Sequence, residues 1–213
     1  MLNVVLVQPE IPANTGNIGR TCVLAGARLH LVGPLGFSLD ERAVRRAGLL
    51  YWQSLDVTTY RDWNDFLERN PSAQVALGAR AGDASVVSET TPPAEAVPAM
   101  HLLTKAGQRI YSDATYHDGD WLVFGKESAG LDRELLLAHP DLCERIPMRG
   151  DDALTGADAW HASHERLHPE AERDICGNFV DSREGVVASL NLSNSVAIVL
   201  FEALCQLGWP GLG

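Results

Sequence analysis

The feature that most limits how this chain can fold is an apolar run at its start, followed by a helical segment and a second apolar run. Leu2–Val7 is rich in β-branched residues and stops just before a Gln-Pro pair, which is typical of a buried strand in a parallel sheet. Apolar positions then recur at helical spacing up to Gly26, which is placed to end the helix, and residues 29–32 form the next strand. This order predicts a parallel α/β unit at the start of the chain.

The same alternation continues along the sequence. Further strands are expected at residues 57–60 and 122–124, and further helices at residues 62–69, 132–138 and 192–207. We therefore expect one domain of the α/β class that spans residues 1–213.

Polar residues mark the expected starts of three helices. Asn14 or Thr15 is the expected cap of the first helix, and Asn191 or Ser193 the cap of the last, because a side-chain oxygen there accepts a free backbone N–H. Residues 38–41 (Ser-Leu-Asp-Glu) have the spacing of a capping box and predict a short basic helix after them.

Two stretches interrupt the alternation and are expected to be peripheral insertions. Residues 72–98 are rich in Ala, Ser, Thr and Pro, with a short strand expected at Gln74–Leu77. Residues 150–185 are acidic and carry histidines, with little continuous apolar patterning.

The charge of the chain argues against indiscriminate binding to nucleic acid. The formal net charge is −11, and contacts to a phosphate backbone depend on local positive potential. Any RNA site is therefore expected to be a local basic patch.

The start of the chain and its cysteines favour a cytoplasmic protein. The N-terminal segment has no basic leader, and its apolar run is far shorter than the roughly 20 residues that a membrane span needs. Four widely spaced cysteines form no C-x-x-C pair, so reduced thiols are expected.

Residues 14–20 (Asn-Thr-Gly-Asn-Ile-Gly-Arg) place amides, glycines and one arginine at the start of the first helix. Free backbone N–H groups there suit an anion, and Arg20 adds a charged fork for a phosphate. The alternative is an ordinary helix cap with a surface arginine. The spacing is not that of a dinucleotide fingerprint, which requires G-x-G-x-x-G.

Two further motifs offer binding groups without a strong acid or base. Residues 124–131 (Phe-Gly-Lys-Glu-Ser-Ala-Gly-Leu) continue a strand into glycines that let a ligand approach the backbone, although an ordinary tight turn has the same pattern. The other motif is divided between residues 146–148 (Ile-Pro-Met) and residues 189–194 (Ser-Leu-Asn-Leu-Ser-Asn), whose hydroxyls and amides suit orientation of a ligand.

In this order the four segments resemble the signature motifs of the SPOUT methyltransferases. Within that class the chain is most similar to the TrmL group, tRNA 2′-O-methyltransferases that act on the wobble nucleotide. Residues 45–52, which run Arg-Arg-Ala-Gly-Leu-Leu-Tyr-Trp, also resemble that group. The resemblance implies a doubly wound, mainly parallel sheet with a C-terminal trefoil knot, S-adenosylmethionine as methyl donor, and methylation of cytidine or uridine at position 34 of tRNA.

The resemblance also implies roles for individual residues. The donor pocket would be lined by Leu103, Gly125, Ile146, Met148 and Ser189. The catalytic geometry would be set by Arg20, Asn14, Glu127 and Asn191. Since a guanidinium is always charged, Arg20 is expected to bind a phosphate and stabilise the developing alkoxide electrostatically.

The resemblance also implies two binding partners, tRNA and a second copy of the chain. Arg45, Arg46 and Lys126 would contact the tRNA anticodon stem-loop, with a solvated helix face as the alternative. Tyr51 and Trp52 would stack on a base, with burial in the core as the alternative favoured for Trp52. The enzyme would be a homodimer that shares residues between active sites, through the apolar face of residues 192–207 and the first helix, and it would not associate with membranes.

The chain departs from the family pattern at one place, and two alternative functions stay open beside the one that the resemblance implies. Forty residues separate Met148 from Ser189, where close relatives have a handful. The alternatives are a SPOUT enzyme with another RNA target, such as rRNA, and a catalytically silent protein that binds RNA or S-adenosylmethionine. His161, His164 and His168 have helical spacing in this segment, but Pro169 follows and a fourth ligand is distant, so no metal is expected.

Overall fold

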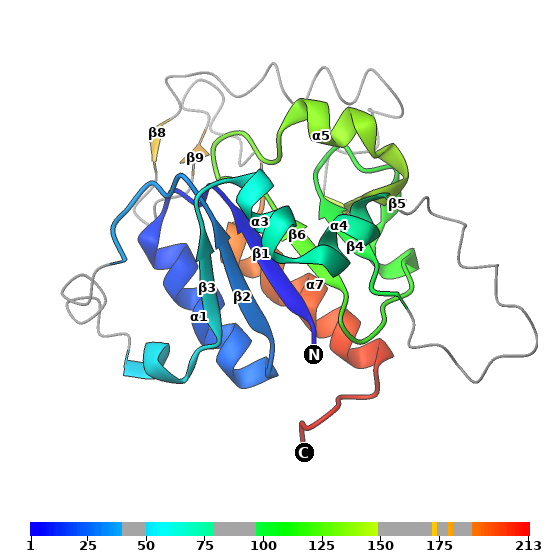
Figure 1. Ribbon diagram of the computed structural model, residues 1–213, viewed down its shortest axis with the longest axis horizontal. Helices are drawn as coiled ribbons and strands as arrows, with labels where there is room; N and C mark the ends of the chain where they lie inside the picture. Colours follow the sequence, from blue (N-terminus) through cyan, green and yellow to red (C-terminus); the bar gives the residue numbers. More distant parts are fainter. Residues whose placement is uncertain (40–49, 79–96, 149–171, 174–178, 181–188) are drawn as a thin grey trace, which may run out of the picture.

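Within the residues that the computed structural model describes, 1–39, 50–78, 97–148, 172–173, 179–180 and 189–213, seven strands form one sheet (Figure 1). In sheet order they are β3 (Val57–Tyr60), β2 (Arg28–Val32), β1 (Asn3–Val7), β6 (Trp121–Phe124), β4 (Met100–Leu103), β7 (Cys143–Arg145) and β5 (Arg109–Ile110). Every neighbouring pair in this sheet is parallel. The expected parallel α/β class is therefore confirmed.

Helices cover both faces of the sheet (Figure 1). The α-helices are α1 (Pro12–Ala25), α3 (Trp63–Arg69), α4 (Pro71–Gly78), α5 (Arg133–Ala138) and α7 (Leu192–Gln206). Short 3-10 turns are η1 (Leu50–Ser54), η3 (Tyr111–Asp113) and η4 (Pro140–Leu142), and β8 (Glu172–Arg173) pairs antiparallel with β9 (Phe179–Val180) apart from the main sheet.

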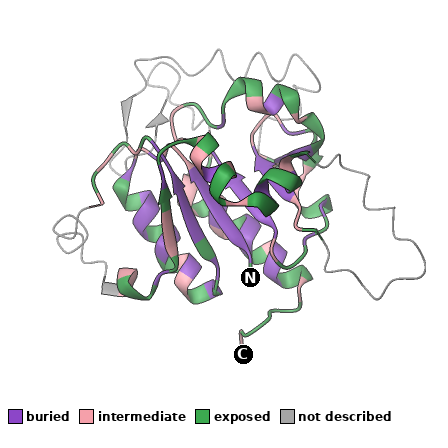
Figure 2. Ribbon diagram, viewed as in Figure 1, coloured by how far each residue is buried: buried purple, intermediate pink, exposed green. Residues whose placement is uncertain are grey.

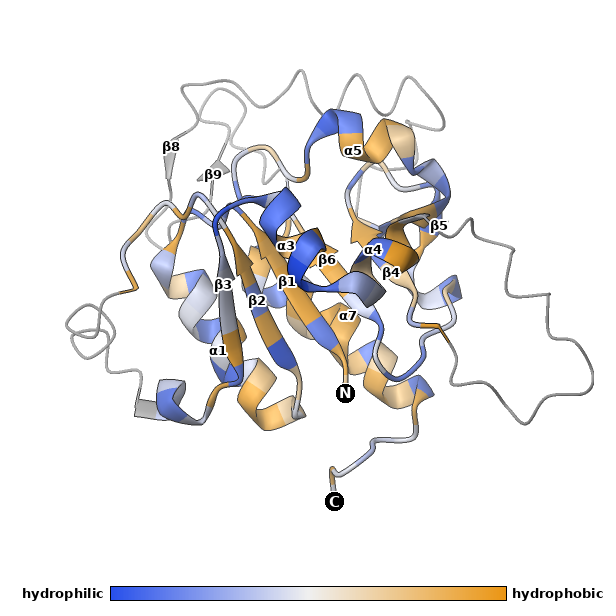
Figure 3. Ribbon diagram, viewed as in Figure 1, coloured by the Kyte–Doolittle hydropathy of each residue, from blue (hydrophilic) through white to orange (hydrophobic). Residues whose placement is uncertain are grey.

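Two buried apolar clusters hold the layers together. Along β1, Val4 and Leu6 pack in the cluster that contains α1 and α7 residues, whereas Val5 packs in the cluster that contains Phe66 of α3 and Leu136 of α5. Successive strand residues point to opposite faces, so a strand buried on both sides is apolar at nearly every position. Figure 2 shows this burial, and Figure 3 shows the apolar strands.

Residues 71–78 correct one expectation. The strand expected at Gln74–Leu77 was wrong, because these residues belong to α4. Ala73 and Ala76, three positions apart, are buried on one side of this helix and pack in the same cluster as Phe66. Residues 79–96 lie outside the described part, and so do most of residues 150–185.

The start of α1 also differs from the expectation. Its N-cap is Ile11, which makes no side-chain cap hydrogen bond, and Pro12 follows at the first helical position. Asn14 and Thr15 lie inside the helix, so neither is its cap. The end of α1 is as expected, with Gly26 in the left-handed conformation at φ 63°.

The last helix follows the sequence pattern closely. It spans Leu192–Gln206, and Asn191 is its cap, since the Asn191 side chain accepts hydrogen bonds from the backbone N–H groups of Ser193 and Asn194. Across the described residues, every helix is too short or too polar to cross a membrane.

Candidate active site

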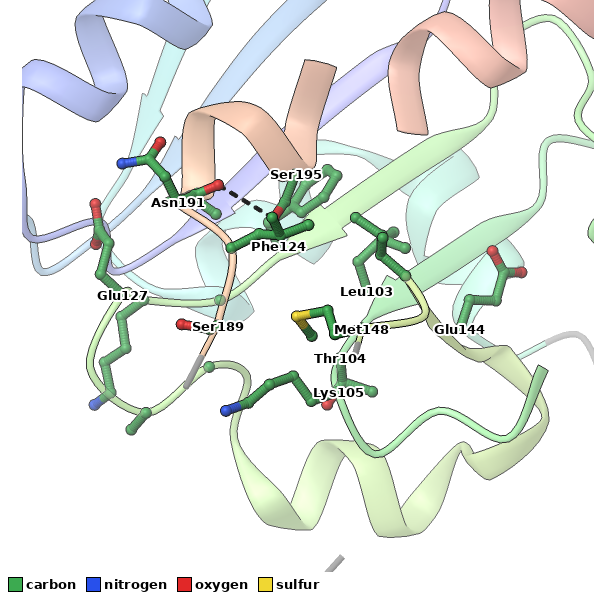
Figure 4. Close-up of a pocket in the computed structure, with 17 residues that line it drawn as sticks. Leu103, Thr104, Lys105, Phe124, Glu127, Glu144, Met148, Ser189, Asn191 and Ser195 are labelled. Atoms are coloured by element: carbon green, nitrogen blue, oxygen red, sulfur yellow. Dashed lines mark hydrogen bonds between the residues drawn. The ribbon is translucent and has the colours of Figure 1, made fainter. Parts of the chain in front are cut away.

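A pocket lies where β4, β6 and β7 end, the edge at which ligands of parallel α/β sheets bind. Four segments line it: residues 103–105, 124–130, 144–148 and 189–195. Leu103 and Met148 lie on one side in Figure 4, with Ser189 and Asn191 opposite. The glycine turn, the Ile-Pro-Met segment and the Ser-Leu-Asn segment therefore meet in one cavity, as the sequence motifs predict.

The five residues expected to hold the donor all line this pocket: Leu103, Gly125, Ile146, Met148 and Ser189. Three other expected site residues also line it, namely Lys126, Glu127 and Asn191. Asn14 and Arg20 are not among the lining residues. Arg45 and Arg46 lie outside the described part of the chain.

Gly125 is required by the way its loop closes. Backbone hydrogen bonds join Lys126 and Gly130 in both directions, from Lys126 N to Gly130 O at 3.2 Å and from Gly130 N to Lys126 O at 2.8 Å. A Cβ at position 125 would lie 2.0 Å from the carbonyl carbon of Gly130 and 2.1 Å from Leu131 N. No side chain fits there, so the loop folds back on bare backbone at the pocket wall.

Glu127 binds the start of α1 from the neighbouring loop. Its carboxylate accepts hydrogen bonds from Glu10 N at 2.8 Å, Ile11 N at 3.3 Å and Asn14 Nδ2 at 3.0 Å. Glu127 thereby supplies the negative charge and the acceptors that the helix start lacks locally. A carboxylate that receives three N–H donors holds the β6–α5 loop and the start of α1 together.

Glu10 also binds the β6–α5 loop. Its carboxylate accepts hydrogen bonds from Ser128 N and from Ser128 Oγ, both at 2.9 Å. Glu10 and Glu127 thus each bind the loop that carries the other. Sequence reasoning missed Glu10 and Ser128, because the two residues are 118 positions apart and no local pattern pairs them.

Asn14 joins Glu127 to Asn191. The Asn14 side chain is 2% exposed, and while its Nδ2 donates to Glu127, its Oδ1 accepts a hydrogen bond from Asn191 Nδ2 at 2.9 Å. A continuous chain of side-chain hydrogen bonds therefore runs from the β6–α5 loop through α1 to the cap of α7. Three of the four residues expected to set the catalytic geometry belong to this chain.

Arg20 lies apart from that chain, on the exposed side of α1. Its guanidinium carbon is 5.2 Å from the centroid of the Tyr51 ring, within the range of a cation–π contact. Trp52 is half-buried and packs against the α1–α7 core cluster.

A buried charged cluster lies behind the pocket wall at Glu144, which is fully buried. Glu144 Oε1 is 2.8 Å from His101 Nδ1, and His101 Nε2 is 3.2 Å from Asp120 Oδ2. Arg109 donates to Glu144 from its exposed side, at 2.5 Å, and the Tyr116 hydroxyl donates at 3.3 Å. Sequence reasoning missed this cluster, since its members come from separate strands and loops.

Two carboxylates surround the His101 ring and decide its charge. Burial alone would lower the pKa of His101, but the hydrogen bonds and negative charges of Asp120 and Glu144 outweigh it and raise that pKa to about 9. His101 is therefore protonated at neutral pH and balances part of the negative charge buried beside the pocket.

No group of three or more His, Cys, Asp or Glu within the described ranges is arranged to hold a metal ion. His161, His164 and His168 lie outside those ranges.

The parallel sheet and the meeting of the four motif segments in one pocket agree with the class of protein that the sequence motifs indicate. The chain belongs to the SpoU rRNA Methylase family, whose profile matches residues 1–153.

Full-length relatives agree with this assignment. A tRNA (cytidine(34)-2′-O)-methyltransferase of Burkholderia cenocepacia is 38% identical and aligns over 99% of both chains. The protein of the same name from Escherichia coli K12 is 36% identical, over 99% of this chain and 97% of its own.

Solved structures with similar sequences share the fold. An RNA methyltransferase structure from Bacillus anthracis has a TM-score of 0.67 at 33% identity, covering 100% of this chain and 98% of its own. A structure described as concerning "2-OH methylation of C/U34 on tRNA" has a TM-score of 0.64 at 31% identity, covering 98% and 97%.

Proposed function

We propose that the chain transfers a methyl group from S-adenosylmethionine to the ribose 2′-hydroxyl of the wobble nucleotide of tRNA, cytidine or uridine at position 34. The observation that carries this proposal is the convergence of the motif segments in one pocket, joined by the chain of hydrogen bonds from Glu127 through Asn14 to Asn191. The names of the full-length relatives support the same substrate.

The pocket fits the methyl donor in its chemistry. Leu103, Phe124 and Met148 offer apolar surface for a flat base, and Gly125 lets the backbone of Gly130 pack closely enough to form the pocket wall. Ser189 and Asn191 add polar groups on the opposite side. The donor, when bound, supplies an electrophilic methyl group on a sulfonium.

The chain's own residues orient the reaction instead of forming a covalent intermediate. Glu127 is engaged with three N–H donors, and Asn14 and Asn191 are neutral amides. Direct in-line transfer requires no protein nucleophile, so alignment of hydroxyl and methyl supplies much of the rate. The O–CH3 bond would form as the S–CH3 bond of the donor breaks, the neutral thioether would leave, and the hydroxyl proton would pass to solvent. Arg20 would bind the phosphate next to the wobble nucleotide and stabilise the developing alkoxide.

A homodimer accounts for the position of Arg20. Arg20 is exposed and does not line the pocket of its own chain, so a second copy would have to bring its arginine to this pocket. Exposed apolar side chains on or beside α1 and α7 suit such a contact: Leu24, Ile198, Phe201 and Trp209. The rings of Phe201 and Trp209 pack on each other with centroids 5.9 Å apart.

Three further expectations belong to this proposal. The C-terminal segment would pass through a loop to form the trefoil knot of the class, which agrees with the meeting of residues 124–130 and 189–195 at one pocket. Arg45, Arg46 and Lys126 would bind the anticodon stem-loop. The enzyme would work in the cytoplasm, where tRNA is modified, without a membrane or a metal ion.

The test is methylation of unmodified total tRNA by the purified protein with labelled donor, followed by nucleoside analysis. The expected product is 2′-O-methylcytidine or 2′-O-methyluridine at position 34. Label that enters rRNA alone would favour the other RNA target, and donor binding without transfer would favour a silent binding protein. Label on a base would contradict the proposed reaction.

A further inference from the structure

We propose that Tyr51 is a positioning residue that holds the Arg20 guanidinium in its working orientation; this rests on the proposed function, in which Arg20 stabilises the transition state. The Tyr51 ring lies under the guanidinium, 5.2 Å from its carbon to the ring centroid. Because one face of the ring is taken by Arg20, the ring is less available as a stacking platform for a base.

The Tyr51 hydroxyl fixes the ring to the same helix that carries Arg20. It donates a hydrogen bond to the backbone carbonyl of Gly16, at 2.5 Å. Gly16 and Arg20 are four positions apart and lie on one face of α1. The ring is therefore tied one turn below the side chain that it supports.

Close packing of η1 on α1 makes this contact possible. A Cβ at Gly19 would lie 3.0 Å from Leu55 Cδ2 and 3.2 Å from Trp52 Cζ3. Because Gly19 has no side chain, the turn that carries Tyr51 packs directly on the α1 backbone beside Arg20. The sequence motif around Gly19 indicates an anion-binding helix start or an ordinary helix cap, and the structure shows that Gly19 also admits the turn that carries Tyr51.

Tyr51 can hold the Arg20 guanidinium in place without exchanging a proton with it. Burial raises the pKa of the Tyr51 hydroxyl, against a lowering by the Arg20 charge, so the phenol is neutral and can donate to Gly16. An exposed arginine otherwise samples many rotamers. The ring restricts the guanidinium from one face, and a side-chain hydrogen bond from Arg20 to the Tyr51 oxygen holds it further, so that the other N–H groups of Arg20 can bind a phosphate.

The test compares Tyr51→Phe and Tyr51→Leu in the wild-type chain and in an Arg20→Ala background, with single-turnover rates on tRNA and labelled donor. Tyr51→Leu is expected to lower the methyl-transfer rate about 10-fold, and Tyr51→Phe, which keeps the ring, about 3-fold. In the Arg20→Ala background neither substitution is expected to lower the residual rate further. Donor affinity should stay unchanged in all variants, since Tyr51 does not line the pocket.

Arg69→Ala is a matched control. The Arg69 guanidinium carbon lies 4.6 Å from the centroid of the Tyr60 ring, a cation–π pair of the same kind outside the pocket, and its loss should leave the rate unchanged.

The outcomes separate this inference from the proposed function. A wild-type protein that methylates no ribose overturns both. An active wild type with a fully active Tyr51→Leu variant overturns the inference alone. Equal rate losses in both backgrounds would mean a purely structural role, and a rise in the KM for tRNA in both backgrounds would mean base stacking; either result overturns it.

Discussion

Asn191 donates a hydrogen bond from its side-chain amide to Oδ1 of Asn14, 177 positions away in the sequence, at 2.9 Å. The same Asn191 side chain accepts from Ser193 N at 2.8 Å as the cap of α7. One residue therefore both starts the last helix and joins it to the first. Loss of its two functions can be measured separately.

Asn191→Asp keeps the capping oxygen but replaces the N–H donor, and it places a carboxylate against Asn14 Oδ1. We expect methyl transfer to fall by about 10-fold or more while the cap contribution to stability is retained. Asn191→Ala removes both functions and should also lower the free energy of unfolding by about 1 kcal/mol. Parallel denaturant titrations and initial rates check this, and equal activity of the Asp variant and the wild type would contradict it.

Gly125→Ala should abolish donor binding. Its Cβ would lie 2.0 Å from the Gly130 carbonyl carbon, so the loop that forms the pocket wall cannot close. Gly78→Ala is the control, because a Cβ there meets nothing within 4 Å. Calorimetric titration with S-adenosylmethionine provides the measurement; donor binding of normal affinity by the Gly125→Ala variant would mean that the donor binds elsewhere.

Arg20→Ala should separate donor binding from catalysis. Since Arg20 is exposed and does not line the pocket, donor affinity is expected to stay within about twofold, while the transfer rate falls about 100-fold. Arg20→Lys keeps the charge without the planar fork and should recover only part of the rate. Full turnover by the Ala variant would remove Arg20 from the proposed mechanism.

The buried His101 predicts how stability depends on pH. Its folded-state pKa is raised to about 9, above its ordinary value of 6.5, so its contribution is complete below pH 6.5 and is lost as pH rises through about 9. We expect deprotonation of His101 to lower the free energy of unfolding by up to about 3 kcal/mol between pH 6.5 and pH 10. Urea titrations across this range would reveal the slope.

His101→Gln supplies the control for that slope. It removes the positive charge between Asp120 and Glu144 and leaves Glu144 paired with Arg109 alone, so the variant should be several kcal/mol less stable at pH 7. The difference in unfolding free energy between this variant and the wild type should become smaller above pH 9. A deficit that stays constant from pH 6.5 to pH 10 would show that His101 is not charged in the folded protein.

Four of the seven strands, β1, β2, β3 and β6, could be predicted from local sequence, whereas the site could be predicted only from motif resemblance. Strands such as Val57–Tyr60 and the glycine stop of α1 follow from patterns within a few residues. The contact of Glu10 with Ser128 arises from the order of strands, which places β1 beside β6, and no residue near Glu10 indicates it.

Two wrong expectations have the same cause. Asn14 has the right chemistry for a cap, but Glu127 accepts from the start of α1 instead, which leaves Asn14 to join Glu127 and Asn191. Gln74–Leu77 reads as a strand by composition, yet the burial of Ala73 and Ala76 against the sheet stabilises a helix. In both cases a distant tertiary contact outweighs the local preference.

The attachment of Glu127 to Glu10, Ile11 and Asn14 has a thermodynamic consequence for the two substrates. A ligand that immobilises the β6–α5 loop also immobilises the first turn of α1, so part of the entropy cost of ordering that helix is met before a second ligand arrives. Binding of one substrate should then raise the affinity for the other, and by reciprocity the increase in affinity is the same in whichever order the two bind.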